Sequence, residues 1–93
     1  ALKQALAALP MLEEYGVELI EQPLPPDDLE GMRTITAAST IPVVADESCK
    51  TSLDIPKLVG AVDVINIKLA KCGSLREAVR MIHTARSHRM QVM

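Results

Sequence analysis

The chain alternates between short runs typical of β-strands and longer helical patterns, and this alternation restricts the fold more than any other feature. The strand-like runs cover residues 17–21, 43–46 and 62–68, and a segment with apolar residues at helical spacing follows each one. Strands separated by helices pair in parallel through right-handed crossovers. The pattern therefore predicts an α/β fold with a parallel sheet, in which the carboxyl ends of the strands lie at one edge.

Capping and stop signals predict where the helices begin and end. Pro10 is expected to break or kink the first helix, because proline lacks the N–H that a helix interior needs. Asp27 is the expected cap of the second helix, with Glu30 three residues later. Ser74 and Glu77 show the same capping-box spacing before the last helix.

Composition excludes several classes of function. Of the 93 residues, 48% are hydrophobic, which indicates a packed core, while the aromatic share of 1% argues against base stacking. A net charge of -2 without a basic block also argues against a nucleic-acid partner. No apolar run reaches the ~18 residues of a membrane span. Cys49 and Cys72 are expected to be reduced thiols, so the predicted location is the cytoplasm.

A closed barrel and an open doubly wound sheet are both built from strand–helix units. No Gly-x-Gly-x-x-Gly follows any of the strand-like runs, so the phosphate-binding turn of a dinucleotide fold is missing. Three successive strands instead end in polar side chains, which barrel closure would turn toward one axis. The prediction is a partial parallel (β/α)8 TIM-type barrel of about three βα units with flanking pieces.

Three charged residues are expected to meet at the carboxyl edge of this sheet. Alternation places Asn66 and Lys68 on the same face of the third strand, opposite a uniformly apolar face. The same rule directs Glu21 and Asp46 to that side of the first and second strands. Adjacent strands lie ~4.8 Å apart, so the two carboxylates could share one divalent cation beside a lysine base.

Each of these residues also has a purely structural interpretation. Glu21 could be an ordinary carboxylate at a strand end, and Asp46 could cap the following turn. Glu47 could replace Asp46 as a ligand, although alternation directs it to the other face. Lys68 could be solvated, and Lys71 is expected to be a solvated loop residue. Asn66 could bond to the site or to loop backbone.

Three motifs in the chain resemble those of one known family. Glu-Gln-Pro begins at Glu21, Asp-Glu-Ser begins at Asp46, and Asn-Ile-Lys-Leu-Ala-Lys-Cys-Gly begins at Asn66. Together they resemble the muconate-lactonizing-enzyme subgroup of the enolase superfamily, and the third motif is most similar to dipeptide epimerases of the L-Ala-D/L-Glu type. The resemblance covers essentially all of the chain. One departure is Ser74, which stands where family members commonly have a second glycine.

The resemblance implies roles for the three charged residues. Glu21 and Asp46 match two of the three carboxylates that hold Mg²⁺, and Lys68 matches one of two acid/base lysines. The third carboxylate and the other lysine would lie before Ala1. Residues 1–93 would then be the middle of the C-terminal enolase-like barrel domain, incomplete at both ends and inactive alone.

The implied activity is Mg²⁺-dependent epimerisation of a dipeptide by removal of the proton next to a carboxylate, through an enolate. A nearby metal ion would lower the pKa of Lys68 so that it can act as a base. The substrate is expected to be a small molecule, a dipeptide or another carboxylate. Muconate cycloisomerisation, o-succinylbenzoate synthesis, a Schiff-base aldolase with Lys68 as nucleophile and an inactive fragment stay open, as does a homo-oligomer of the full-length protein.

Overall fold

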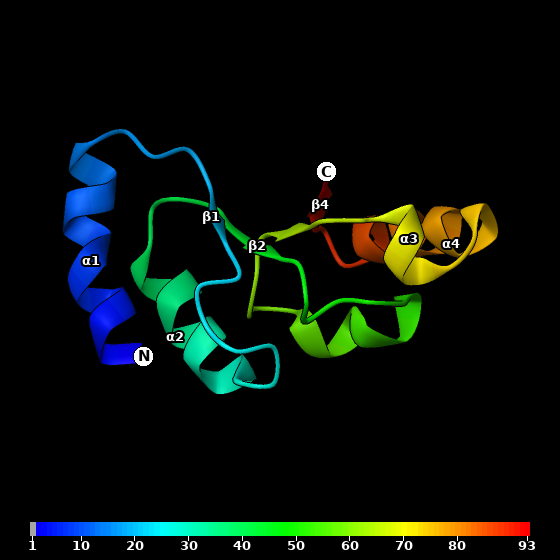
Figure 1. The fold of residues 1–93 in the computed structure, drawn as a ribbon, viewed down its shortest axis with the longest axis horizontal. Coiled ribbons are helices and arrows are strands. Elements are labelled where there is room, and N and C mark those ends of the chain that lie inside the picture. Colours follow the sequence, from blue (N-terminus) through cyan, green and yellow to red (C-terminus); the bar gives the residue numbers. More distant parts are fainter. Residues whose placement is uncertain (1) are drawn as a thin grey trace.

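The computed structural model describes residues 2–93 and contains one parallel four-stranded sheet (Figure 1). The strands are paired in chain order, as β1-β2-β3-β4. Their bounds are β1 Ile20–Glu21, β2 Val43–Ala45, β3 Val64–Ile65 and β4 Gln91–Val92. All three pairings are parallel, which confirms the predicted strand direction.

Helices connect the successive strands, as the alternation predicted. Helix α1 precedes β1, α2 lies between β1 and β2, and two short 3-10 turns connect β2 to β3. After β3 the chain forms a single-turn helix and then a long helix that leads into β4. The bounds are α1 Leu2–Glu14, α2 Leu29–Ala38, η1 Ser52–Asp54, η2 Pro56–Leu58, α3 Leu69–Cys72 and α4 Leu75–Ser87. The sheet therefore forms the α/β architecture of a partial barrel.

The helix is not broken at Pro10, and the predicted cap of α2 is wrong. Pro10 lies inside α1, which continues to Glu14, and the α1 side chains that pack in or against the core all precede the proline (Leu2, Ala5, Leu6 and Leu9). The cap of α2 is Asp28 and not Asp27. A turn closed by the Asp28 N–H and the Pro25 carbonyl, 3.0 Å apart, starts the helix one residue later than expected.

The cap of α4 is Ser74, as predicted. Its hydroxyl oxygen accepts a hydrogen bond from the Glu77 N–H at 3.1 Å. The Glu77 carboxylate does not close a capping box. It accepts the Ser52 N–H at 2.7 Å and so connects α4 to the start of η1.

The hydrophobic core lies between one face of the sheet and the surrounding helices. Val43, Ala45 and Ile65 belong to this cluster and are fully buried, together with Met32 and Ile35 of α2. Burial of each large side chain in such a core is worth about 1.5–3 kcal/mol. Helix α4 adds its own buried side chains to the same cluster. Within residues 2–93, no helix is long and apolar enough to cross a membrane.

Alternation along the short strands leaves their other side chains on the opposite face. Val44 and Val64 are buried but lie outside the cluster that the helices share. Asp46 lies two positions after Val44, and Glu21 directly follows Ile20, which packs against the core. Alternation therefore puts both carboxylates on the same side as the two valines. The face that carries the predicted site residues is therefore separate from the helix-packed core.

Candidate active site

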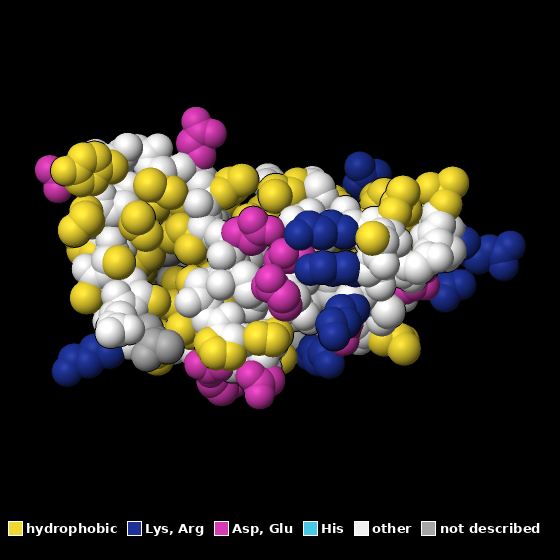
Figure 2. Space-filling model, in the orientation of Figure 1, with side chains coloured by type: hydrophobic (Ala, Val, Ile, Leu, Met, Phe, Trp, Pro, Cys, Tyr) yellow, Lys and Arg dark blue, Asp and Glu magenta, His cyan; other side chains and the backbone are white. Residues whose placement is uncertain are grey.

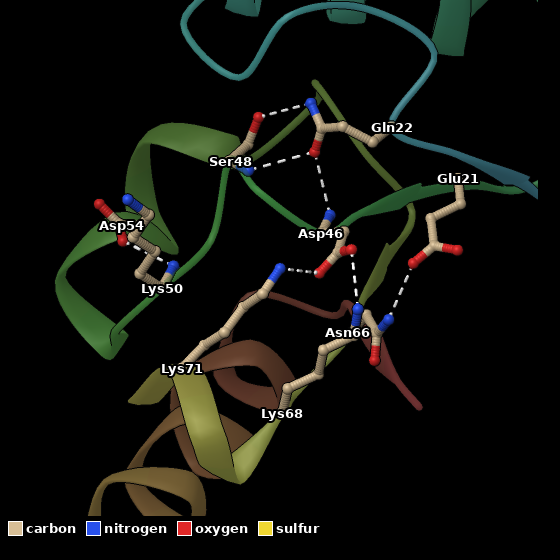
Figure 3. Close-up of polar contacts among 9 residues, drawn as sticks. All are labelled: Glu21, Gln22, Asp46, Ser48, Lys50, Asp54, Asn66, Lys68 and Lys71. Atoms are coloured by element: carbon tan, nitrogen blue, oxygen red, sulfur yellow. Dashed lines mark hydrogen bonds and ion pairs between the residues drawn. The ribbon is translucent and has the colours of Figure 1, made fainter. Parts of the chain in front are cut away.

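The three predicted site residues come together at the carboxyl edge of the sheet. Lys68 Nζ lies 2.9 Å from Asp46 Oδ2, across the ends of β3 and β2 (Figure 3). Glu21, at the end of β1, accepts a hydrogen bond from Asn66 Nδ2 at 2.9 Å. Asn66 therefore bonds to a site residue, which is one of the two roles that the sequence left open for it. Their placement at one edge is observed, whereas their chemical roles remain predictions.

A second lysine joins this cluster, contrary to the expectation that Lys71 is a solvated loop residue. Lys71 Nζ lies 3.0 Å from Asp46 Oδ1, so each carboxylate oxygen has its own ammonium partner. Helix α3 is the cause, since its single turn is closed by the Lys71 N–H bonding to the Lys68 carbonyl at 2.9 Å. Residues three apart in one helical turn lie on the same side. The Lys-x-x-Lys spacing of Lys68 and Lys71 was the sequence feature that could have indicated that both lysines reach the site.

The exposure of this cluster is uneven, and acidic and basic side chains meet near the middle of the face shown in Figure 2. The Asp46 side chain is only 9% exposed, while those of Lys68 and Lys71 are 44% and 38% exposed. The hydrogen bond from Lys68 is the largest influence on the pKa of Asp46 and, with that from Lys71, lowers it against the opposing effect of burial. Asp46 is therefore held as a carboxylate.

The pKa of Lys68 is raised, chiefly by its hydrogen bond to Asp46. The negative charges of Glu21 and Glu47 act in the same direction. The expected lowering assumed positive charge from a metal ion close to the amine, whereas the neighbours described in residues 2–93 are mainly acidic. In this arrangement Lys68 carries a proton that it can donate.

Gln22 is a site residue that sequence reasoning missed. Its side-chain oxygen accepts the N–H groups of Asp46 and Ser48 at 3.0 and 3.1 Å. Its side-chain nitrogen donates to the Leu24 carbonyl and to Ser48 Oγ, both at 2.9 Å. These bonds connect the loop after β1 to the loop after β2 (Figure 3). The position of Gln22 in the Glu-Gln-Pro motif could be read from the sequence. Its bonds to Asp46 and Ser48 could not, because these partners are distant in sequence.

Glu47, the alternative ligand, lies in the loop after β2 and is exposed. It lines a cavity of about 420 Å³ with residues that include Pro26 and Lys50. Asp46, and not Glu47, makes the direct contacts with the lysines of the site. The geometry therefore favours Asp46 as the carboxylate that faces the reacting groups.

The donor set fits part of a magnesium site. Glu21 and Asp46 offer hard oxygen ligands from neighbouring parallel strands, the ligand type that Mg²⁺ prefers. Glu21 bonds to Asn66 and Asp46 bonds to Lys68, so both carboxylates lie beside the segment of residues 66–68. No group of three or more possible metal-binding side chains occurs within residues 2–93. These two residues would therefore supply part of a coordination shell that keeps other positions for further ligands.

Comparison with known proteins gives consistent results. Residues 1–93 match the family described as Enolase C-terminal domain-like. The chain is 44% identical over 98% of its length to an L-Ala-D/L-amino acid epimerase of Maribacter sp., and it covers 27% of that protein. It is 41% identical over 89% of its length to muconate cycloisomerase 1 of Rhodococcus opacus, of which it covers 23%.

A solved structure also matches closely. The dipeptide epimerase from Enterococcus faecalis V583, complexed with Mg and the dipeptide L-Leu-L-Tyr, superimposes with a TM-score of 0.94 at 40% identity. The alignment covers 99% of this chain and 27% of that protein. The chain thus spans about a quarter of the length of the relatives it matches.

Proposed function

Because the chain belongs to the Enolase C-terminal domain-like family, we propose that it forms part of a longer Mg²⁺-dependent enzyme that epimerises dipeptides. In that enzyme residues 1–93 are the middle part of the barrel domain. The observation that carries the proposal is the convergence of Glu21, Asp46 and Lys68 at the ends of three adjacent parallel strands. Relatives named as dipeptide and L-Ala-D/L-amino acid epimerases support the same substrate class.

Lys68 is the proposed proton carrier. In one direction its neutral amine takes the proton from the α-carbon next to a carboxylate, the C–H electron pair moves into the enolate, and Nζ becomes an ammonium. In the other direction the ammonium returns a proton to that carbon and becomes neutral. Inversion needs a proton exchanged on each face of the carbon, so Lys68 serves one face and a second group serves the other.

Glu21 and Asp46 are the proposed magnesium ligands in these residues. Bound Mg²⁺ would supply Lewis-acid stabilisation of the negative charge that develops on the substrate carboxylate. Asn66 holds one oxygen of Glu21, and Lys71 holds one oxygen of Asp46, so each carboxylate is oriented by a neighbour. Partners of this kind fix the orientation of each carboxylate group.

Muconate cycloisomerisation is the second candidate, because a relative with that activity matches the chain at 41% identity. It would use the same carboxylates and the same lysine, since that reaction also passes between an enolate and a protonated carbon. Substrate tests separate the two: turnover of muconate without epimerisation of any dipeptide would favour the cycloisomerase.

The test uses the full-length enzyme with L-Ala-L-Glu in D₂O. The expected result is formation of the epimer with deuterium at the inverted carbon, loss of activity in EDTA and recovery with Mg²⁺. Lys68→Met should lower epimerisation by about a hundredfold or more. Lys3→Met, at an exposed position of α1, is the matched control and should retain activity.

Two outcomes would contradict the proposal. Epimerisation that is unaffected by EDTA would exclude the metal role of Glu21 and Asp46. Borohydride trapping of a carbonyl substrate on Lys68 would indicate a Schiff-base aldolase.

Residues 1–93 alone should show no turnover, because one lysine can serve only one face of the carbon.

A further inference from the structure

Gln22 has a backbone conformation that does not suit its side chain. Its φ is 43°, in the left-handed region that glycine occupies readily and other residues rarely do. The residue follows the proposed ligand Glu21 directly. Strained positions of this kind persist where surrounding contacts determine them, and they concentrate at functional sites. A glutamine kept where glycine fits better indicates that the side chain itself is needed.

The side chain of Gln22 completes the sheet at the point where the main-chain ladder ends. The Gln22 N–H still donates to the Val44 carbonyl at 2.8 Å, as in a parallel ladder. In a continued ladder the Asp46 N–H would bond to the main-chain carbonyl of residue 22. It bonds instead to Gln22 Oε1 at 3.0 Å. The amide side chain therefore substitutes for the carbonyl that the left-handed turn directs elsewhere.

The remaining bonds of the same amide fix the start of the loop after β2. Gln22 Oε1 also accepts the Ser48 N–H, and its amide nitrogen donates to Ser48 Oγ. Ser48 Oγ in turn donates to the Pro26 carbonyl at 2.8 Å. The residues on both sides of Glu47 are thus held by one side chain, and Asp46 is the one that faces the lysines.

We infer that Gln22 is a positioning residue, whose side-chain amide holds the Asp46 main chain in register with Glu21 so that both carboxylates face the same metal ion. This inference rests on the proposed function. It assigns Gln22 no contact with substrate or metal. The effect is transmitted through the Asp46 N–H, whose nitrogen is three covalent bonds from the carboxylate carbon of the same residue.

The test measures Mg²⁺ binding by the full-length enzyme with isothermal titration calorimetry, and amide exchange of residues 44–49 with mass spectrometry. Gln22→Met removes all four side-chain hydrogen bonds and keeps the strained backbone. Gln22→Gly removes the bonds and also relieves the strain, so it is expected to fold. Both variants should bind Mg²⁺ about tenfold to a hundredfold more weakly, with faster exchange at Asp46 and Ser48. Gln4→Met, exposed on α1, is the matched control.

Each alternative outcome is informative. If Gln22→Gly binds Mg²⁺ within twofold of the wild type and Asp46 exchanges at the same rate, only the backbone shape matters and the inference is overturned. If Gln22→Met fails to fold, Gln22→Gly alone decides. If the wild type itself binds no Mg²⁺, the proposed function fails, and the exchange rate at Asp46 still tests whether Gln22 holds that residue.

Discussion

Gly31 lies in the first turn of α2, where helix propensity and local packing predict opposite effects of adding a methyl group. Replacing an interior helical glycine with alanine typically gains up to about 1 kcal/mol. At this position, however, a Cβ would lie 2.5 Å from Leu24 Cδ1 and 2.6 Å from Asp28 Oδ2. Both distances are too short, so the neighbours must move. Gly31→Ala is therefore expected to destabilise the protein.

The size of the effect follows from what must move. Leu24 is 3% exposed, so its shift overpacks the core, at a cost of about 1–3 kcal/mol. Asp28 caps the helix through the Gly31 N–H at 3.0 Å, and loss of such a cap costs about 1 kcal/mol. After subtraction of the propensity gain, the net loss of unfolding free energy should be about 1–3 kcal/mol. Because the Leu24 carbonyl accepts a bond from Gln22, the disturbance also reaches the site.

Urea unfolding of the full-length protein, followed by circular dichroism, measures this loss. Thr34 provides the matched control, because it is exposed on the same helix. The difference between Thr34→Ala and Thr34→Gly gives the propensity term alone, expected near 1 kcal/mol in favour of alanine. A Gly31→Ala protein that is as stable as the wild type, or more stable, would show that the steric argument is wrong.

Two further predictions concern titrating groups outside the site. The pKa of Glu77 is lowered, chiefly by the Ser52 N–H that it accepts, so its stabilising effect is present above the unfolded pKa of about 4.3 and is lost as pH falls through the folded value. The melting temperatures of wild type and Glu77→Gln should therefore differ at pH 7 and converge in acid, and a constant difference would contradict this. Burial raises the pKa of Cys49 to about 12, so iodoacetamide should label the partly exposed Cys72 first, and equal labelling of the native protein would contradict that.

The sequence predicted the placement of the site well because strand alternation is a local property. Once β1, β2 and β3 are parallel neighbours, a period of two determines that Glu21, Asp46 and Lys68 share a face. No knowledge of distant contacts is needed for that step. Strand direction follows in the same way, from the helices between the strands.

Contacts that depend on loop geometry could not be predicted in this way. Lys71 contacts Asp46 because the chain forms the single turn of α3 directly after residues 62–68. The strand-like pattern of those residues gives no indication that a helical turn follows. The bonds of Gln22 to Ser48 depend on a left-handed residue that no propensity favours in a glutamine. The cap of α2 moved from the expected residue to its neighbour for a similar reason, since the preceding turn set the start of the helix.

The sheet has two outer sides within residues 2–93, since β1 pairs only with β2 and β4 pairs only with β3. In the proposed barrel, these are the sides at which strands of the rest of the protein pair, so main-chain hydrogen bonds continue across both of them. Residues 1–93 produced alone would instead present both sides to foreign strands, and the two-residue length of β1 and of β4 limits how many main-chain groups each side exposes.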